Sequence, residues 1–368
     1  MSTLSQPERI LYGRQMKLEK FGEENQIKLK TSRVLVVGAG GLGCPVLQYL
    51  VAAGVGNIGI IDHDVVSMHN LPRQILFKPE DVNTNKALTA AEHLTKMNSY
   101  VSIRPYAFKL TTENAKEILS QYDIVIDGTD NFKSRFLIND FCKELSKPVI
   151  YGAIQQLQGQ ISVFHRPDKN GISYELRDVY PDEPKEGIVS SCTEVGVLGS
   201  SAGVVGSLMA NETIKLISNI GENAIGYFIV VDMDDNGISK FTINKLNNSN
   251  SEIPQNNHRE IDGENKDLSP QQLKMWIKQN KKFILIDIRE QYERNYFNIG
   301  GTHRPLSTFN TTNIDVPHNE IVVLYCQHGQ RSYQLKHYLE TQYHFNNIYH
   351  LADGIAEWIN TYGMVSTD

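Results

Sequence analysis

Cysteine is scarce in this chain. The 368 residues include only four cysteines, and no two of them form a CxxC pair. They stand far apart, at Cys44, Cys142, Cys192 and Cys326. A secreted fold held by disulfides is therefore not expected, and clustered cysteine ligands for zinc are missing. We expect reduced thiols in a cytoplasmic protein, and we predict that Cys44 and Cys142, within apolar helix-like runs, lie in the core.

The sequence also has neither a strong charge nor an apolar leader. Its formal net charge of -6 at pH 7 gives no reason to expect nucleic acid as a partner. The opening "MSTLSQPERILYGRQ" contains no apolar core of a signal peptide. One uncharged run, from Val34 to Ile61, is long enough to cross a membrane. It contains seven glycines and reads as strand, glycine turn, helix and strand, so we expect no membrane segment.

The order of strand-like and helix-like runs predicts an α/β fold in two domains. Residues 1–30 read as helical, and strands then alternate with helices up to Gly152, as in a Rossmann-like, mostly parallel sheet. After Gly152, three runs look like antiparallel strands around one helix, which makes the sheet mixed. Residues 247–267 are polar and are predicted to link a first domain, residues 1–246, to a small α/β domain, residues 268–368.

A glycine-rich turn, "VVGAGGLG", stands between the first predicted strand and the helix that follows it. Gly38, Gly40 and Gly43 have GxGxxG spacing, and Gly41 lies between them. Glycines let the backbone approach a phosphate, and the helix N-terminus favours its negative charge. Asp62 ends the next strand, where an acidic residue would bind ribose hydroxyls. Taken alone, this pattern predicts a dinucleotide-dependent oxidoreductase.

Further polar residues are expected at the same edge of the sheet. "HNLPRQ" contributes Asn70 and Arg73, "NTNKA" contributes Lys86, and "DGTDN" contributes Asp130 and Asn131 after a strand. Ligands of open α/β sheets bind at the carboxyl ends of the strands. Two cations and a carboxylate suit a triphosphate with Mg2+ better than a nicotinamide. Two alternatives stay open: Lys86 is a solvated lysine, or Asp130 is a helix N-cap.

Several segments together resemble the MoeB/ThiF family of ubiquitin-activating (E1-like) adenylyltransferases, over residues 8–245. They are "LYGRQ", "GAGGLG", "IDHDVVSMHNLPRQ", "NKA" and "DGTDNFKSRFLINDFC", in this order. Family members use ATP and Mg2+ to adenylate the C-terminal glycine of a ubiquitin-fold sulfur carrier, and they act as homodimers. The resemblance implies that Arg73 and Lys86 bind the phosphates, Asp62 the ribose and Asp130 the magnesium. Arg14 of "LYGRQ" would enter the site from the neighbouring subunit.

The sequence departs from this family at the expected zinc ligands. Relatives usually bind a structural zinc through two CxxC pairs. Glu175 and Asp178 stand where the first pair should fall, and "KLNNSNSE" contains no cysteine for the second. Since closed zinc sites are normally made of thiolates and imidazoles, we predict no structural zinc. Glu175 and Asp178 are either ligands of a hard metal or, as we favour, surface carboxylates.

Cys192, in "SSCTEVGVLGS", is retained. In many relatives a cysteine here accepts the activated carrier as a thioester or an acyl-disulfide, after a thiolate attacks the acyl-adenylate and expels AMP. An inert thiol in a loop is the alternative.

The last cysteine, Cys326, lies in "YCQHGQRS" between a strand-like and a helix-like run. The N–H groups of such a loop can stabilise a thiolate or persulfide anion; Gly329 lies in the loop, and Arg331 would add positive charge. "ILIDIREQYERNYFNIGGTHRPL" and "LADGIAEW" resemble a rhodanese domain over residues 268–365. The resemblance implies that Cys326 is the nucleophile that carries persulfide sulfur. A phosphatase with a CX5R loop is the alternative.

Together the two halves predict an adenylyltransferase joined to a sulfurtransferase. The first would activate a carrier of MoaD or ThiS type with a Gly-Gly terminus, and the second would supply sulfur from a cysteine desulfurase or thiosulfate. The product would be a thiocarboxylate for molybdopterin, thiamine or tRNA thiolation. Arg73, Asp130, Cys192 and Cys326 are the predicted catalytic residues. An NAD-dependent oxidoreductase with a sulfur-binding domain and a non-catalytic carrier-binding scaffold are the competing hypotheses.

Overall fold

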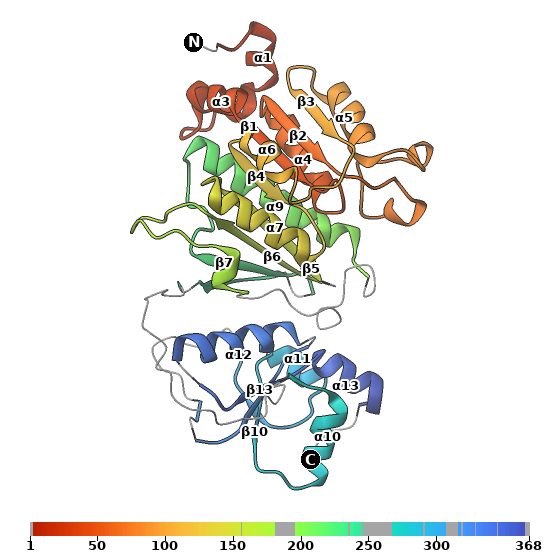
Figure 1. The fold of residues 1–368 in the computed structure, drawn as a ribbon, viewed down its shortest axis with the longest axis vertical. Helices are drawn as coiled ribbons and strands as arrows, with labels where there is room; N and C mark the ends of the chain where they lie inside the picture. Colours follow the sequence, from red (N-terminus) through yellow and green to blue (C-terminus); the bar gives the residue numbers. More distant parts are fainter. Residues whose placement is uncertain are drawn as a thin grey trace. The chain divides into compact units, whose positions relative to one another are not determined.

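The chain divides into two compact units, Met1–Lys245 and Leu246–Asp368, each of which is described by itself (Figure 1). The computed structural model describes residues 3–155, 157–180, 196–234, 236–243, 245, 267–289, 291–306, 316–317, 319–327, 329–343 and 345–364. Most of the predicted linker lies outside these residues, so its limits stay a prediction. Within the described ranges, no helix has both the length and the apolar character needed to cross a membrane.

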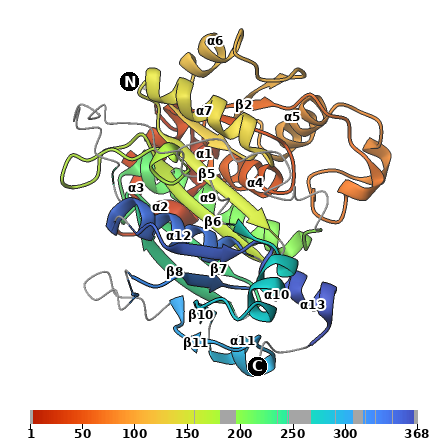
Figure 2. The ribbon, with the colours of Figure 1, turned by 60° about the horizontal axis from the view of Figure 1, so that its bottom comes forward.

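The first unit is built on an eight-stranded mixed sheet with the order β3-β2-β1-β4-β5-β6-β7-β8. The strands are β1 Arg33–Val37, β2 Asn57–Ile61, β3 Ser102–Tyr106, β4 Ile124–Asp127, β5 Val149–Gln155, β6 Gln158–Phe164, β7 Tyr227–Asp232 and β8 Gly237–Thr242. The first five strands are parallel, whereas β6 to β8 pair antiparallel and form one end of the sheet (Figure 2). The predicted change from parallel to antiparallel pairing is confirmed.

Helices cover both faces of this sheet. They are α1 Gln6–Leu11, α2 Gly13–Met16, α3 Gly22–Thr31, α4 Gly43–Ala53, α5 Lys86–Met97, α6 Ala115–Ser120, α7 Phe132–Glu144 and α9 Gly199–Ser218, with short 3-10 turns at Met68–Asn70, Pro79–Asp81 and Leu176–Asp178. Val36 of β1 is fully buried in one core with Leu50 of α4 and Met209 of α9. Successive strand residues face opposite sides, and Leu35 and Val125 are also fully buried. Burial on both faces explains the continuous apolar strands of the sequence.

The strand order opens a crevice where β1 and β4 are neighbours. From β1 the chain moves outward to β2 and β3, and it then returns past β1 to β4 and β5. Val37 is the register partner of Asp127, so both strands end at the same level. The next residues stay close: the N–H of Gly128 donates to the carbonyl of Val37 at 2.9 Å. Such a reversal of strand order is where open α/β sheets bind ligands.

The second unit contains a five-stranded parallel sheet with the order β11-β10-β12-β13-β9. Its elements are β9 Asp267–Leu268, α10 Pro270–Lys278, β10 Ile284–Asp287, α11 Gln291–Tyr296, β11 Thr302–His303, β12 Val322–Tyr325, α12 Gln330–Tyr343, β13 Ile348–Leu351 and α13 Gly354–Tyr362. Trp358 of α13 packs with Leu351 in one core, and Leu339 of α12 packs with Leu324 in another. The predicted small α/β domain is confirmed, and its sheet includes Asp267.

Candidate functional site

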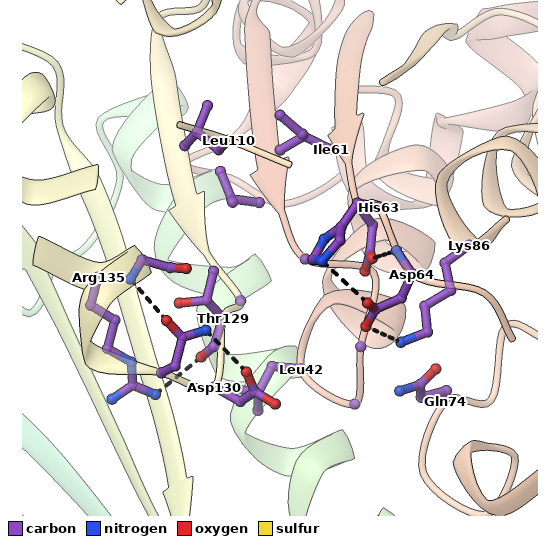
Figure 3. A pocket seen from close by; sticks show the side chains of 18 of the residues that line it. Leu42, Ile61, His63, Asp64, Gln74, Lys86, Leu110, Thr129, Asp130 and Arg135 are labelled. Carbon is purple, nitrogen blue, oxygen red and sulfur yellow. Dashed lines mark hydrogen bonds and ion pairs between the residues drawn. The ribbon is translucent and has the colours of Figure 1, made fainter. Parts of the chain in front are cut away.

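A cavity of about 200 Å³ lies at the carboxyl ends of β1, β2 and β4 (Figure 3). Segments far apart in the sequence contribute to its wall: the glycine bend after β1, the residues after β2, the segment after β3, the start of α7 and the region near the start of α9. Eight of the predicted nucleotide-binding residues line this cavity: Gly38, Gly40, Gly41, Asp62, Arg73, Lys86, Asp130 and Asn131.

The bend after β1 requires glycine because backbone atoms approach each other closely there, even without a ligand. Gly38 has a φ of +95°, and a Cβ on it would lie 2.8 Å from the carbonyl oxygen of Gly128. A Cβ on Gly43 would lie only 1.9 Å from the carbonyl oxygen of Gly38. Gly40 and Gly41 line the cavity together with Gly38, whereas Gly43 does not. The predicted set therefore divides into glycines that face the cavity and one that closes the turn.

Asp62 braces this bend from the end of β2. Its carboxylate accepts hydrogen bonds from the N–H groups of Ala39 at 2.8 Å and Asp64 at 2.9 Å. Burial raises the pKa of the Asp62 carboxyl above its ordinary value, although Lys86 and the two N–H groups act in the opposite direction. The predicted ribose-binding carboxylate is thus at the cavity and is held beside the turn.

Lys86 is the first residue of α5, and its ammonium group reaches the cavity. Only 6% of the residue is exposed, so the alternative of a solvated lysine is wrong. Its Nζ lies 3.0 Å from Oδ2 of Asp64. Partial burial would raise the pKa of the Asp64 carboxyl, but the hydrogen bond and the charge of Lys86 outweigh it and lower that pKa. The sequence reasoning missed Asp64, two residues after Asp62 in "IDHDV", as the partner of this lysine.

Arg73 and Gln74 line the cavity from the segment between β2 and α5. Nη1 of Arg73 donates to the carbonyl of His69 at 3.0 Å. Gln74, which the sequence reasoning did not consider, is 4% exposed, and its Oε1 has no hydrogen-bond partner among the described residues. The predicted Asn70 is not a wall residue: it is buried, and its Oδ1 accepts from the N–H of Ser67 at 3.2 Å.

Asp130 and Asn131 follow β4, and they have different roles. Oδ1 of Asn131 accepts from the N–H of Ser134 at 2.9 Å and caps α7. The alternative that Asp130 is the N-cap is therefore wrong. Asp130 is exposed at the cavity wall, and its Oδ1 accepts from Nδ2 of Asn131 at 3.3 Å (Figure 3). Because Asp130 does not cap α7, its carboxylate is available there to a metal ion or a ligand.

Arg135 is a buried wall residue that the sequence reasoning missed, although it stands in the quoted "NFKSRF". Its Nη2 donates to the carbonyl of Thr129 at 3.1 Å, and its Nη1 donates to the hydroxyl of Tyr151 at 2.9 Å. The first bond ties α7 to the loop that carries Asp130, and the second ties α7 to β5. Arg14, by contrast, is exposed on α2 and does not line the cavity of its own chain.

The other predicted site residues of the first unit are Cys192, Glu175 and Asp178. Cys192 lies outside the described residues. Glu175 faces Lys143, with 2.7 Å between Oε1 and Nζ, and Asp178 faces Lys245 at 3.3 Å. Each of these carboxylates therefore has a lysine partner, but the side chain of Glu175 is only 12% exposed and that of Asp178 only 4%, so the prediction of surface carboxylates is wrong.

One cluster of possible metal ligands occurs in the described part of the chain, formed by Asp62, His63 and Asp64. Their ligand atoms lie within 4.8 Å of one another. Since Asp64 is already paired with Lys86, the cluster is not a set of free ligands.

In the second unit, Cys326 ends β12 and begins a tight loop. Only 1% of Cys326 is exposed. Its Sγ accepts from the N–H of Ser332 at 3.4 Å and lies 3.6 Å from Oγ of Ser332. Gly329 has a φ of +82°, and a Cβ on it would lie 2.6 Å from the backbone N of Asp353. The loop is thus pressed against the start of α13, with its sulfur turned toward the N-terminus of α12.

Arginines surround this loop, but each has acidic or carbonyl partners. The guanidinium of Arg331 faces the carboxylate of Glu293, with contacts of 2.9 and 2.5 Å. The buried Arg289 contacts Oδ2 of Asp287 at 2.8 Å and donates to Oε1 of Gln327 in the loop at 3.1 Å. Arg289, which the sequence reasoning did not single out, holds the loop in position, while the charge of Arg331 is shared with Glu293.

The phosphatase alternative fails on spacing. Cys326 and Arg331 are separated by the four residues "QHGQ", whereas a CX5R loop needs five. The expectation that this loop fits the phosphatase pattern is therefore wrong.

Comparisons with known proteins agree with this division of the chain. A model of the ThiF family matches residues 12–253, and a model of the rhodanese-like domain matches residues 269–361. The chain is 36% identical over 370 residues to a probable adenylyltransferase/sulfurtransferase MoeZ of Mycobacterium tuberculosis, a match that covers 97% of this chain and 94% of the relative.

Two further similarities concern the first unit. A sulfur carrier protein adenylyltransferase of Thermus thermophilus is 46% identical over 235 residues, which is 64% of this chain and 87% of the relative. The crystal structure of PaaA superposes with a TM-score of 0.57 and 21% identity, covering 67% of this chain and 76% of the other. At that identity the superposition speaks for the fold alone.

Proposed function

This chain belongs to the ThiF family and carries a C-terminal rhodanese-like domain, and on that basis we propose that it adenylates a sulfur carrier protein and then supplies sulfur to it. The substrate would be the C-terminal glycine of a ubiquitin-fold carrier with a Gly-Gly end. ATP would donate the AMP group, and the product would be an acyl-adenylate that sulfur then converts to a thiocarboxylate. Molybdopterin, thiamine and tRNA thiolation are the pathways that use such a product.

The observation that carries this proposal is the meeting of Lys86, Arg73 and Asp130 in one cavity beside the glycine bend. A carrier carboxylate that attacks the α-phosphate of ATP brings two anions together. At 4 Å two unit charges repel by roughly 1 kcal/mol in water and about 4 kcal/mol at an effective dielectric constant near 20. Fixed cations offset that repulsion best in a closed site. No general base is required, because the carboxylate is already ionised.

Each wall residue has a role in this scheme. Lys86 and Arg73 would bind the phosphates, with the ammonium of Lys86 exchanging its contact with Asp64 for a phosphate oxygen. Asp62 would bind the ribose hydroxyls. Asp130 fits a magnesium ion, which is usually held by one or two carboxylates and by substrate phosphates. When bound with ATP, the magnesium ion would neutralise phosphate charge.

The finer assignments rest on the same family resemblance. Arg14 is exposed and does not line its own cavity, which supports a homodimer in which one subunit supplies Arg14 to the other. Cys192 would accept the activated carrier as a thioester or acyl-disulfide. In the second unit, Cys326 would take sulfane sulfur from thiosulfate or from a persulfide made by a cysteine desulfurase. The loop with Gly329 would hold it, with Arg331 paired to Glu293 beside the loop. We place these reactions in the cytoplasm.

The adenylation half is tested by exchange of labelled pyrophosphate into ATP, measured with the full chain, Mg2+ and a candidate carrier. We expect exchange with a carrier that ends in Gly-Gly and none with the same carrier lacking its last glycine. Asp130→Asn should abolish exchange, whereas Glu222→Gln, which also removes one carboxylate charge but lies outside the cavity wall, should not. Exchange that is absent with every carrier, together with binding of NADH in the cavity, would favour the oxidoreductase alternative.

The sulfurtransferase half has a separate test. Cys326→Ala should still form the acyl-adenylate but should lose thiocarboxylate formation from thiosulfate or a persulfide donor, as read by intact mass of the carrier. Loss of both reactions would contradict two separable sites. Exchange that survives Asp130→Asn would refute the assignment of Asp130, and a protein that binds carrier without exchange would be a scaffold.

A further inference from the structure

A buried row of polar side chains leads away from the sulfur of Cys326. Oγ of Ser332 lies 3.6 Å from Sγ of Cys326 and 3.4 Å from Nδ1 of His350. None of the three residues is exposed to solvent by more than a few per cent: Cys326 is 1%, Ser332 0% and His350 4% exposed. Water is therefore poorly placed to take a proton from this thiol, and within the described part of the loop and its surroundings the hydroxyl of Ser332 connects the sulfur to a side-chain base, His350.

The row continues on the other side of the imidazole. Nε2 of His350 lies 3.0 Å from Oδ1 of Asp267, although its N–H direction misses good hydrogen-bond geometry. Nζ of Lys336 lies 2.8 Å from the same oxygen. The pKa of the Asp267 carboxyl is well below its ordinary value, first because of His350 and then because of Lys336. The pairing of β13 with β9 places His350 opposite Asp267, so the sheet register builds this contact.

We propose that Ser332 and His350 form a proton relay for Cys326, with Asp267 as the residue that positions the imidazole. The inference rests on the proposed role of Cys326 as the nucleophile that carries sulfur. The relay explains where the thiol proton of Cys326 goes when this buried cysteine attacks a sulfur donor.

The hydroxyl of Ser332 has the geometry of a shuttle. It carries one hydrogen and has three acceptors within reach: the carbonyl of Gly329 at 2.9 Å, Nδ1 of His350 at 3.4 Å and Sγ of Cys326 at 3.6 Å. A neutral His350 with its hydrogen on Nε2, the nitrogen that faces Asp267, has a lone pair on Nδ1. That lone pair can accept the proton of Ser332 while the hydroxyl receives the proton of the thiol.

The half-reaction with thiosulfate balances without another reactant. The Sγ–H bond of Cys326 breaks, and its proton passes through Ser332 to Nδ1 of His350. Sγ forms a bond to the sulfane sulfur, the S–S bond of thiosulfate breaks, and sulfite leaves with the electron pair. When an acceptor such as cyanide removes the terminal sulfur as thiocyanate, the Cys326 thiolate takes the proton back. Asp267 stabilises the imidazolium between these two steps.

The relay predicts a particular dependence on pH. His350 is faced by Asp267, Tyr333 and Asp353. Two more titratable groups are one contact further away: Lys336 behind Asp267, and Cys326 behind Ser332. Of these, Cys326 is the one whose proton leaves and returns in each turnover. A variant without the relay must lose the thiol proton directly to solvent, and this becomes easier as the concentration of hydroxide rises with pH.

The test is the rate of thiocyanate formation from thiosulfate and cyanide by the full chain between pH 6 and pH 9, expressed at each pH as a ratio to the wild type. His350→Asn keeps a hydrogen-bonding group near the place of Nδ1 but cannot hold a proton there. We expect kcat to fall roughly 100-fold at pH 6.5, the low end of the range for a proton-transfer group, and to recover most of that loss by pH 9. The KM for thiosulfate should not change.

Two further variants make the result decisive. Ser332→Ala removes the hydroxyl bridge and should reproduce the pH-dependent loss, and it stands in for His350→Asn should the latter misfold. His337→Asn, a change of a half-buried histidine on α12, is the matched control and should leave the ratio flat and near one. A purely structural role of His350 would lower the rate by the same factor at every pH, and that result overturns the relay.

Failure of the relay and failure of the proposed function give different results. If Cys326→Ser is inactive while Ser332→Ala and His350→Asn keep the wild-type rate at every pH, only the relay is refuted. If Cys326→Ser still forms thiocyanate at the wild-type rate, the proposed role of Cys326 is refuted, and the relay falls with it.

Discussion

The glycine bend after β1 offers the sharpest test of the fold, through an alanine at Gly43 compared with an alanine at Gly40. A Cβ on Gly43 would lie 1.9 Å from the carbonyl oxygen and 2.9 Å from the carbonyl carbon of Gly38. The obstacle is backbone, so no side-chain rotation relieves it. Gly38 is itself fixed, because its N–H donates to the carbonyl of Ile61 at 2.9 Å and its other side faces Gly128. The bend must therefore shift as a whole.

The cost follows from the size of that shift. Overpacking that side chains can absorb typically costs about 1–3 kcal/mol. A backbone collision at a fixed bend belongs at or above the top of that range, so we expect Gly43→Ala to destabilise the first unit by about 3–5 kcal/mol. A domain of this size should then melt roughly 10 °C lower. At Gly40 the nearest atom to an added Cβ is Nε2 of Gln74 at 3.8 Å, an ordinary contact. Gly40→Ala should therefore change stability by less than about 1 kcal/mol.

The assay is differential scanning calorimetry of the full chain, in which the transition of the second unit serves as the internal reference. Because Gly40 lines the cavity, Gly40→Ala should lose pyrophosphate exchange while keeping its melting temperature. Gly43→Ala should lower the first transition and leave the second unchanged. Equal melting shifts for the two variants would refute the assignment of Gly43 as the residue that closes the turn.

Three other outcomes follow from contacts away from the bend. Glu293→Gln should lower the stability of the second unit by about 3 kcal/mol, seen as an earlier second transition, because it leaves the largely buried Arg331 without its carboxylate. Burial lowers the pKa of His165 to about 4. Since an unfolded histidine titrates near pH 6.5, the unfolded chain takes up the proton first, and the free energy of unfolding of the first unit should fall by roughly 2–3 kcal/mol between pH 6.5 and pH 4. Denaturant titrations should show that His165→Gln removes this loss. A chelator should leave the first transition unchanged and metal analysis should find no zinc, because Glu175 and Asp178 each face a lysine; a lowered transition after chelation contradicts this.

The fold was predictable from the sequence because its signals are local. Apolar runs, glycine turns and helix starts mark β1, α4 and β2 one after another, and covered parallel strands leave continuous apolar stretches. The change to antiparallel pairing after β5 is visible in part: the connections from β5 to β6 and from β7 to β8 are short, whereas the connection from β6 to β7 is long and includes α9. Family resemblance added the order in which such elements join.

The contacts within the site were less predictable from the sequence. They depend on tertiary structure, or on which of two adjacent residues of similar chemistry takes a role. Asp130 and Asn131 are both good N-cap residues, and only the backbone at the start of α7 selects Asn131. Asp64 meets Lys86 because a 22-residue excursion returns to the end of β2. Likewise, His350 and Asp267 meet through a register that no local pattern specifies.

The surroundings of Lys86 and Arg331 decide which of these two cations is available to a ligand. Lys86 pairs with Asp64, whose side chain is 54% exposed, so water can solvate this carboxylate when its contact with Lys86 breaks. A polyphosphate can therefore replace Asp64 at little cost. Arg331 pairs with Glu293, and their side chains are only 11% and 9% exposed. Breaking a pair this buried is costly, so Arg331 stays with Glu293. The negative charge of a persulfide on Cys326 must then be met by N–H groups such as that of Ser332 and by protons, and this is why the buried histidine behind the loop matters to its chemistry.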